Sequence, residues 1–335
     1  MSTAKRFANV VKTGRATALG ACLILLAALC LSAAPAQASP ANRTWVSGTG
    51  SDANSCSRAL PCLTFNAAHA ATAAGGEINC VDSGSFGGLI ITKTISIICE
   101  GVVGGVLVTA NSAFIISAGP TDVVILRGLE FEGAGTGFTG IYFSNGGALH
   151  VENCRIRDFN ANGGYGIQFI PGSAAELYVT DTTILHNGSA TIGGGVLIRA
   201  PAGSTSKVVI NQSSVQNNTT GIKAEGPAAG GGVINMTVRE TASTGNTQNG
   251  IVGTMSAGGA AVIMMVDSVA ASHNAAGYGV IADGPSTFVH VGGSSVAGNA
   301  NGVGSSNGGT LLSFKTNQIR GNGSDGTPVT AVASD

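Results

Sequence analysis

One short pattern recurs along this chain at a nearly regular spacing: an alternating run of apolar and polar residues that ends in asparagine. Four such runs are clear, at residues 177–187, 208–218, 289–299 and 312–322. Aligned asparagines are spaced 31, 28, 28, 25 and 23 residues apart, at Asn187, Asn218, Asn246, Asn274, Asn299 and Asn322. A repeat of this length is typical of chains whose units stack on one another to form a continuous core.

A second feature follows each of these turns, a glycine that precedes a branched aliphatic residue. The pairs are Gly166-Ile167, Gly195-Val196, Gly221-Ile222, Gly250-Ile251, Gly279-Val280 and Gly302-Val303. Asparagine tolerates left-handed backbone angles, stacked amides hydrogen-bond to one another, and glycine bends without a side-chain clash. A strand, an asparagine turn, a second strand and a loop therefore predict one coil of a single-stranded parallel β-helix. This all-β fold should wind right-handed, whereas a β-sandwich would need hairpin turns and no asparagine at a fixed corner.

Superposing neighbouring repeats predicts which side chains stack. A shift of 25 residues lays segment 126–132 over segment 151–157 and stacks three pairs of opposite charge: Arg127 over Glu152, Glu130 over Arg155, and Glu132 over Arg157. Adjacent strands lie about 4.8 Å apart, so these pairs predict salt bridges. A catalytic cluster is the alternative interpretation of the same charges. The alignment also turns Cys154 inward, as a buried free thiol.

The strand that opens at the glycine gives the best candidate for a functional surface. Its inward side chains should fill the core, with Phe143 stacked on Phe169. Its outward polar and aromatic side chains are Tyr142, Gln168, Arg199, Lys223, Glu225 and Asp283. Such a strip fits an extended polysaccharide. A solvated structural face is one alternative, and a lyase with Lys223 as base and Glu225 or Asp283 as calcium ligand is another.

The front of the chain predicts export. A basic stretch that reaches Arg15 precedes an apolar run over residues 16–34, and Ala36-Gln37-Ala38 forms a small-x-small cleavage site. A retained membrane anchor is the alternative. Removal of residues 1–38 would leave no further apolar run of about 18 residues, the length that a membrane span needs. We therefore expect a protein of the periplasm, the medium or the cell surface.

Charge and cysteine usage narrow the partners and the compartment. Residues 39–335 carry 12 basic and 17 acidic residues, a net charge of −5, because four cations and no acid precede residue 39. This balance argues against nucleic acid as a partner. In an oxidising compartment the remaining cysteines predict the disulfides Cys56–Cys62 and Cys80–Cys99, with Cys154 unpaired. A zinc site is disfavoured because no C-x-x-C and no nearby histidine pair occurs.

The open end of such a coil needs a cap. We expect residues 39–76 to form an N-terminal segment with a capping helix, and residues 77–335 to form the β-helix. Segment 64–75 fits that short helix, with Thr64 as N-cap, Gly75 as its C-terminal stop and His69 near its exposed side.

Two stretches of the N-terminal region resemble a known superfamily. Residues 45–54 (Trp-Val-Ser-Gly-Thr-Gly-Ser-Asp-Ala-Asn), followed by 61–65 (Pro-Cys-Leu-Thr-Phe), are similar to the start of the N-terminal cap of secreted pectate-lyase-like proteins. Residues 90–101 resemble their first coil. The resemblance runs from about Arg43 to the end of the chain. It implies a secreted bacterial right-handed parallel β-helix repeat protein of the pectin lyase fold.

This resemblance carries no reaction with it. Cys62 stands where the superfamily pattern usually has an aromatic residue, which supports a bridge to Cys56. Members that act on pectin or alginate use acidic calcium ligands with an arginine or lysine base, or aspartates in the hydrolases. The hydrolase motifs Asn-Thr-Asp, Asp-Asp, Gly-His-Gly and Arg-Ile-Lys are absent here, so no catalytic residue is transferred.

The sequence thus predicts an exported, monomeric, non-catalytic β-helix protein without a cofactor. Its polar face would bind a polysaccharide or a component of the cell envelope or matrix. The alternative is a polysaccharide lyase or a related glycan-active enzyme, with calcium as its cofactor.

Overall fold

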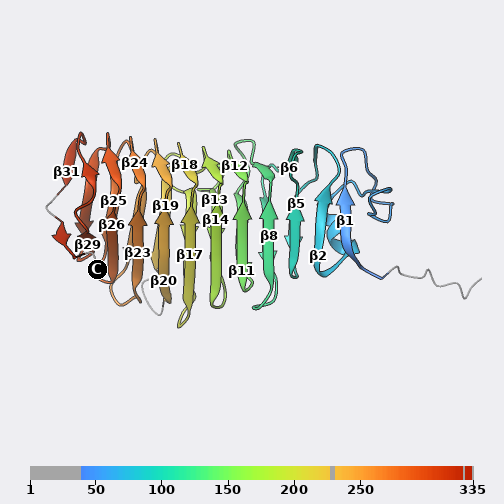
Figure 1. Cartoon of the computed structure of the whole chain (residues 1–335), viewed down its shortest axis with the longest axis horizontal. Helices are drawn as coiled ribbons and strands as arrows, with labels where there is room; N and C mark the ends of the chain where they lie inside the picture. Colours follow the sequence, from blue (N-terminus) through green and yellow to red (C-terminus); the bar gives the residue numbers. More distant parts are fainter. Residues whose placement is uncertain (1–38, 227–230, 327–328, 334–335) are drawn as a thin grey trace, which may run out of the picture. The chain divides into compact units, whose positions relative to one another are not determined.

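The structure, a computed structural model, describes residues 39–226, 231–326 and 329–333. These residues form a right-handed parallel β-helix in which each full coil supplies one strand to each of three parallel sheets, A, B and C (Figure 1). The fold predicted from the repeat is confirmed. The predicted signal peptide, residues 1–38, lies outside the described residues. No helix within the described ranges has the length and apolar character needed to cross a membrane.

Each sheet runs the length of the coil. Sheet A consists of Ala41–Val46 (β1), Thr72–Cys80 (β2), Ile95–Ile98 (β5), Val123–Arg127 (β8), Ala148–Glu152 (β11), Ala175–Thr180 (β14), Thr205–Asn211 (β17), Val233–Arg239 (β20), Val262–Asp267 (β23), Thr287–Gly292 (β26), Thr310–Ser313 (β29) and Thr330–Ala331 (β32). Sheet B consists of Gly84–Ser85 (β3), Gly104–Leu107 (β6), Leu129–Glu132 (β9), Arg155–Arg157 (β12), Thr183–Leu185 (β15), Ser214–Gln216 (β18), Ala242–Thr244 (β21), Ala270–Ser272 (β24), Ser295–Ala297 (β27) and Gln318–Ile319 (β30). Sheet C consists of Leu89–Ile91 (β4), Ser112–Ser117 (β7), Thr139–Asn145 (β10), Tyr165–Phe169 (β13), Gly194–Ile198 (β16), Thr220–Gly226 (β19), Ile251–Met255 (β22), Tyr278–Asp283 (β25), Asn301–Ser306 (β28) and Ser324–Gly326 (β31).

Each alternating run was expected to form one strand, but the structure divides it into two strands. The run 177–187, for example, contains the end of β14 and the whole of β15, separated at Asp181, whose φ is +49°. The same left-handed corner between sheets A and B recurs at Gly128, Asn153, Gln212, Glu240, Ser268 and Gly293. A left-handed residue turns the chain sharply without ending the apolar alternation, so the core pattern continues through the bend.

The corner between sheets B and C holds the predicted asparagine ladder. Asn187, Asn218, Asn246, Asn274 and Asn299 are at least 97% buried, and each accepts a hydrogen bond from the backbone N–H of the coil before it. Side-chain amides also bond along the stack, for example Asn246 Nδ2 to Asn274 Oδ1 at 2.8 Å. At the last coil Asn322 donates to Asp325 instead, at 3.0 Å. The ladder therefore satisfies the buried backbone donors that these turns would otherwise leave unpaired.

The register places all three predicted charge pairs opposite each other, but only two of them form ion pairs. Arg127 contacts Glu152 at 2.6 Å, and Arg157 contacts Glu132. Glu130 lies beside Arg155 in the register yet pairs diagonally with Arg157, at 3.5 Å. Diagonal neighbours are within reach of a long side chain, and Arg157 is the cation that three acids share. Arg155 is exposed and forms no ion pair with the described residues.

The N-terminal cap follows the prediction only in part. The helix α2 spans Phe65–Ala71, with Thr64 as its N-cap, and Phe65 inserts into the core against Phe86 and Phe114. Gly75 does not end the helix, because the chain is already in strand β2 from Thr72.

The predicted exposure of His69 was also wrong. Its ring is only 9% exposed, and Lys93 Nζ donates to the carbonyl oxygens of His69 and Thr72 at 2.6 and 2.5 Å. The lysine satisfies one carbonyl group of α2 and one at the start of β2, and thereby links the segment after β4 to this end of the helix.

The cysteines pair as expected. The disulfides Cys56–Cys62 and Cys80–Cys99 are present, and Cys154 is a buried free thiol whose pKa is raised by burial to about 12. Cys56–Cys62 closes a loop after β1, and Cys80–Cys99 joins the end of β2 to the residue that follows β5.

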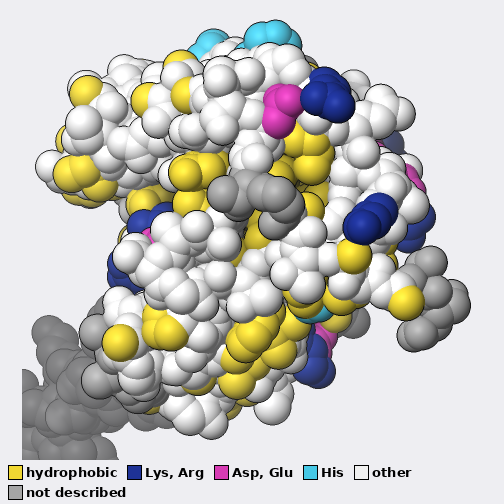
Figure 2. Space-filling model, turned by 90° about the vertical axis from the view of Figure 1, so that its left-hand side faces the viewer, with side chains coloured by type: hydrophobic (Ala, Val, Ile, Leu, Met, Phe, Trp, Pro, Cys, Tyr) yellow, Lys and Arg dark blue, Asp and Glu magenta, His cyan; other side chains and the backbone are white. Residues whose placement is uncertain are grey.

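The C-terminal end has no helix of this kind among the described residues. Its last strands, β30, β31 and β32, have two or three residues each, and apolar side chains are visible on the face of the molecule seen from this end (Figure 2). Ile319 and Val329 pack here, partly buried, against the core. Short edge strands offer little backbone for another chain to pair with.

Candidate functional site

The predicted functional residues lie on the outer face of sheet C. Tyr142, Gln168, Leu197 and Lys223 are register partners in four successive coils. A second row, parallel to the first, contains Glu225, Thr254, Asp283 and Ser306. Strand alternation puts Phe143, Phe169 and Ala224 on the opposite, buried face, and the rings of Phe143 and Phe169 stack at 4.6 Å as predicted. The core thus holds the outward rows at a fixed spacing.

Three of the six predicted residues share one pocket. Tyr142, Gln168 and Arg199 line a hollow of about 460 Å³ that spans β10, β13 and the end of β16. Its other walls come from residues that were not among the six predicted for the site: Ser112, Phe138, Thr139, Ala161, Asn162, Gly163, Tyr165, Ile192 and Leu197. Phe138 and Ile192 are 36% and 62% exposed, so the lining combines exposed apolar side chains with hydroxyl and amide groups.

An ion network borders this pocket. Arg199 Nη2 lies 2.8 Å from Glu225 Oε2, and Lys223 Nζ lies 3.2 Å from Glu225 Oε1. Burial alone would raise the pKa of Glu225, but hydrogen bonds and charges from Arg199 and Lys223 outweigh it and lower the pKa. The carboxylate therefore stays ionised and both cations stay directed at it.

Tyr165 joins the pocket to this network. Burial raises the pKa of its phenol, the charge of Glu225 raises it further, and the charge of Arg199 lowers it. Tyr165 is the residue just before the Gly166-Ile167 pair, and Tyr278 stands in the same place before Gly279-Val280. An aromatic residue directly before this glycine was the available sequence signal for it.

Asp283 lies apart from the other predicted residues. It accepts hydrogen bonds from Ser306 at 2.6 Å, Asn307 at 2.7 Å and Thr254 at 3.2 Å. Burial would raise its pKa, but these hydrogen bonds and the charge of Lys223 lower it. Glu225 and Asp283 are two strands apart in the register, which is about 10 Å at the usual strand spacing. The two carboxylates contact separate partners.

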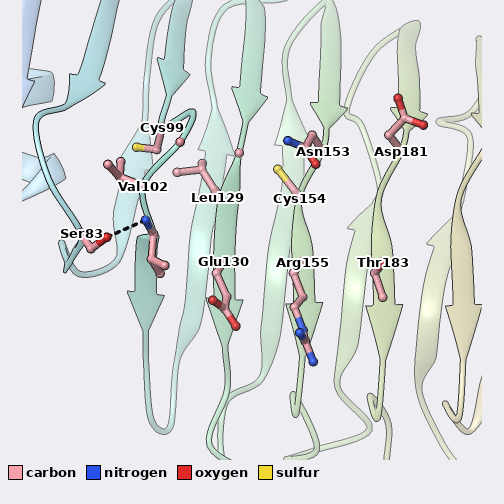
Figure 3. A pocket seen from close by; sticks show the side chains of 13 residues that line it. Ser83, Cys99, Val102, Leu129, Glu130, Asn153, Cys154, Arg155, Asp181 and Thr183 are labelled. Atoms are coloured by element: carbon pink, nitrogen blue, oxygen red, sulfur yellow. Dashed lines mark hydrogen bonds between the residues drawn. The ribbon is translucent and has the colours of Figure 1, made fainter.

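A second hollow, of about 490 Å³, lies on the other side of the coil at the corner between sheets A and B. Glu130, Arg155 and Thr183 line it from three neighbouring strands, and Leu129 and Cys154 line it from the residues just before Glu130 and Arg155 (Figure 3). No cluster of three histidine, cysteine, aspartate or glutamate side chains suited to a metal ion occurs in the part of the chain that the structure describes.

The sequence matches no protein-family model and no curated protein. Among solved structures, the crystal structure of pectate lyase Pel9A is similar to this chain, with a TM-score of 0.45 and 13% identity over 87% of this chain and 77% of that chain. No residue role is taken from a similarity of this size. The fold rests on the strand pairing of the chain itself.

Proposed function

We propose that the protein binds an extended polysaccharide along the outer face of sheet C, outside the cytoplasm, and does not cleave it. The observation that carries this proposal is the pocket of Tyr142 and Tyr165, which adjoins the oriented polar groups of Arg199 and Glu225. Aromatic surfaces together with a few fixed hydrogen-bonding groups suit a sugar, which has both apolar C–H faces and hydroxyl groups.

The repeat of the coil supports a ligand that itself repeats. Each coil advances by about 4.8 Å, close to the length of one sugar ring. The row of Tyr142, Gln168, Leu197 and Lys223 places one side chain in each coil, of which Leu197 is buried. A linear glycan that runs along the coil axis would therefore meet Tyr142, Gln168 and Lys223 at intervals set by the coils.

Two contacts favour binding over cleavage. A lyase would need a free base, but Lys223 Nζ is held by Glu225 Oε1 at 3.2 Å. It would also need acidic groups that converge on a cation, whereas Glu225 and Asp283 face separate partners. The two disulfides support a location in an oxidising compartment outside the cytoplasm.

Binding to a panel of soluble polysaccharides, measured by affinity electrophoresis and calorimetry, tests the proposal. Tyr142→Ala should weaken binding roughly tenfold, as expected for an aromatic residue at the centre of a contact. Tyr178→Ala is the matched control, because Tyr178 is an outward aromatic on sheet A, stacked on His150 at 4.7 Å. It should leave binding unchanged.

The same samples test the lyase alternative. Each polymer is incubated with the protein, with and without calcium, and unsaturated products are followed by ultraviolet absorbance. Release of such products, and its loss in Lys223→Ala, would show that the protein is an enzyme. Equal losses of binding in Tyr142→Ala and Tyr178→Ala would move the site away from sheet C.

A further inference from the structure

We infer that the glycan bound on sheet C is uncharged, so that the protein selects neutral polysaccharides over polyuronates. This inference rests on the binding function proposed above and adds the class of ligand. It follows from the charges at the site, from what a competing carboxylate would displace, and from the groups that remain free to contact a ligand.

The charges at the site already balance one another. Arg199 and Lys223 both contact Glu225, at 2.8 and 3.2 Å. Asp283 supplies a second carboxylate farther along the same row, and its hydrogen bonds come from uncharged groups. Arg199 and Lys223 thus share one carboxylate, and Asp283, two strands farther along, brings the formal charge of these four side chains to zero. A ligand carboxylate would find no cation that lacks a partner here.

A polyuronate would have to displace an existing contact. Glu225 accepts hydrogen bonds from both Nε and Nη2 of Arg199, at 3.3 and 2.8 Å, and its side chain is only 27% exposed. Turning Arg199 toward a ligand would leave a partly buried carboxylate with one cation in place of two. It would also bring a second negative charge next to Glu225. Both effects oppose binding of an acidic sugar.

The groups left for the ligand are uncharged. The pocket lining includes the hydroxyl of Thr139 and the amide of Gln168, whose oxygens lie 3.3 Å apart, together with Tyr142 and Tyr165. Hydroxyl, amide and phenol groups both donate and accept, as sugar hydroxyls do. The net charge of −5 on residues 39–335 adds a general repulsion of polyanions.

The inference is tested by comparing neutral polymers (a β-glucan, a xylan and a galactan) with polygalacturonate and alginate, at low and at physiological ionic strength. The unaltered protein should bind at least one neutral polymer with an affinity that changes little with salt. It should bind both polyuronates at least about tenfold more weakly, and added salt should reduce that difference.

The variant Glu225→Gln tests whether the carboxylate of Glu225 disfavours acidic ligands. It removes the carboxylate that holds Arg199 and Lys223, and should raise the affinity for polyuronates about tenfold at low salt, through freed charge-assisted contacts. Glu176→Gln is the matched control, because Glu176 forms the same kind of pair with Lys207, at 3.0 Å, on sheet A. It should leave the preference unchanged. Thermal melting of both variants confirms that each one folds.

The outcomes separate this inference from the function beneath it. A preference of the unaltered protein for polyuronates would overturn the inference and leave polysaccharide binding in place. No gain in Glu225→Gln, or an equal gain in Glu176→Gln, would also overturn it. Failure to bind any polymer of either class would remove the proposed function and the inference together.

Discussion

The N-terminal and C-terminal parts of the coil share one backbone but differ in what fills them. Up to Phe169 the core is built on phenylalanine: Phe65, Phe86, Phe114, Phe131, Phe143, Phe159 and Phe169 are among the largest fully buried side chains. Beyond Phe169 no phenylalanine is buried in the core, which there consists mainly of isoleucine, valine, methionine and alanine. The asparagine ladder begins at that point, with Asn187.

At the boundary between the two parts, an asparagine replaces a phenylalanine at the same corner position. Phe159 occupies the corner position that Asn187 fills one coil later, and the N–H of Phe159 donates to Asn187 Oδ1 at 3.1 Å. Asn187 N donates to Asn218 Oδ1 in the same way, at 2.9 Å. A buried ring contributes apolar area and an amide contributes hydrogen bonds. The buried position at this corner can therefore be filled either by a phenylalanine ring or by an asparagine amide.

The largest effect is expected from Phe114→Ala, which removes the ring that joins two others. Phe114 packs edge-on against Phe65 at 5.7 Å and Phe131 at 5.0 Å. Loss of a fully buried ring should lower the free energy of unfolding by about 3–5 kcal/mol, measured by chemical denaturation. Phe288→Ala, an outward residue of the C-terminal part that is 38% exposed, should cost less than about 1 kcal/mol. Equal losses of stability in the two variants would contradict the distinction between the N-terminal and the C-terminal core.

Acid should weaken the N-terminal cap selectively. Burial, helped by the charge of Lys93, lowers the pKa of His69 from 6.5 to about 4, and its Nε2 has no partner. The folded state therefore binds fewer protons than the unfolded state between these values. Stability is complete above pH 6.5 and is lost as the pH falls toward 4, by about 1.4 kcal/mol per unit and up to about 3 kcal/mol.

Denaturation curves from pH 7.5 to 4 would measure this loss. His69→Leu keeps an apolar side chain in the site and should flatten the curve. His273→Asn is the control, since His273 is exposed on a C-terminal coil and should leave the loss intact. Persistence of the full loss in His69→Leu would mean that another group unfolds the protein in acid.

The amide ladder gives a smaller, local effect. Asn246→Ala removes the acceptor of Asn218 N, at 3.0 Å, and the donor to Asn274, at 2.8 Å. An unpaired buried amide should cost about 2 kcal/mol, and hydrogen exchange should speed up at Asn218 while strands β5 and β8 stay protected. Asn235→Ala, on the exposed face of sheet A, serves as the control. A uniform rise in exchange along the whole coil would contradict the division into two regions.

The sequence predicted the corner between sheets B and C but not the corner between sheets A and B, for a physical reason. The first corner selects one residue type, since the asparagine amide both accepts from the backbone of the coil before and bonds to the amide of the coil after. The left-handed turn that was expected of the asparagine is made by the residue before it, for example His186, Asn217 or Gly245. The second corner requires only a left-handed backbone. Six residue types meet that requirement here: glycine, asparagine, aspartate, glutamine, glutamate and serine. No single residue type therefore identifies the second corner in the sequence.

The sequence predicted the site residues that lie on strands but not those that lie in loops. Alternation along β10 and β13 was enough to place Tyr142 and Gln168 outward and side by side. Phe138 and Ile192 reach the same pocket from turns, whose paths no periodic pattern fixes. The predicted register also placed Glu130 beside Arg155 correctly, but Glu130 forms its ion pair with Arg157, two residues farther along the strand. Strand pairing fixes Cα positions more tightly than it fixes the ends of side chains.

The smallest effect is expected where the two regions meet, at Cys154. Its register position holds Leu129 in the coil before and Thr182 in the coil after. Cys154 Sγ donates to Glu152 O at 3.3 Å, as Thr182 Oγ1 donates to Thr180 O at 2.9 Å, so the thiol acts as a member of the hydroxyl row of the C-terminal part. Cys154→Ser keeps this donor and should cost less than about 1 kcal/mol, whereas Cys154→Leu overfills the site and should cost about 1–3 kcal/mol. Urea denaturation of the two variants compares them directly. If leucine were tolerated better than serine, Cys154 would belong with the apolar coils before it, and the boundary between the two regions would move one coil toward the C-terminus.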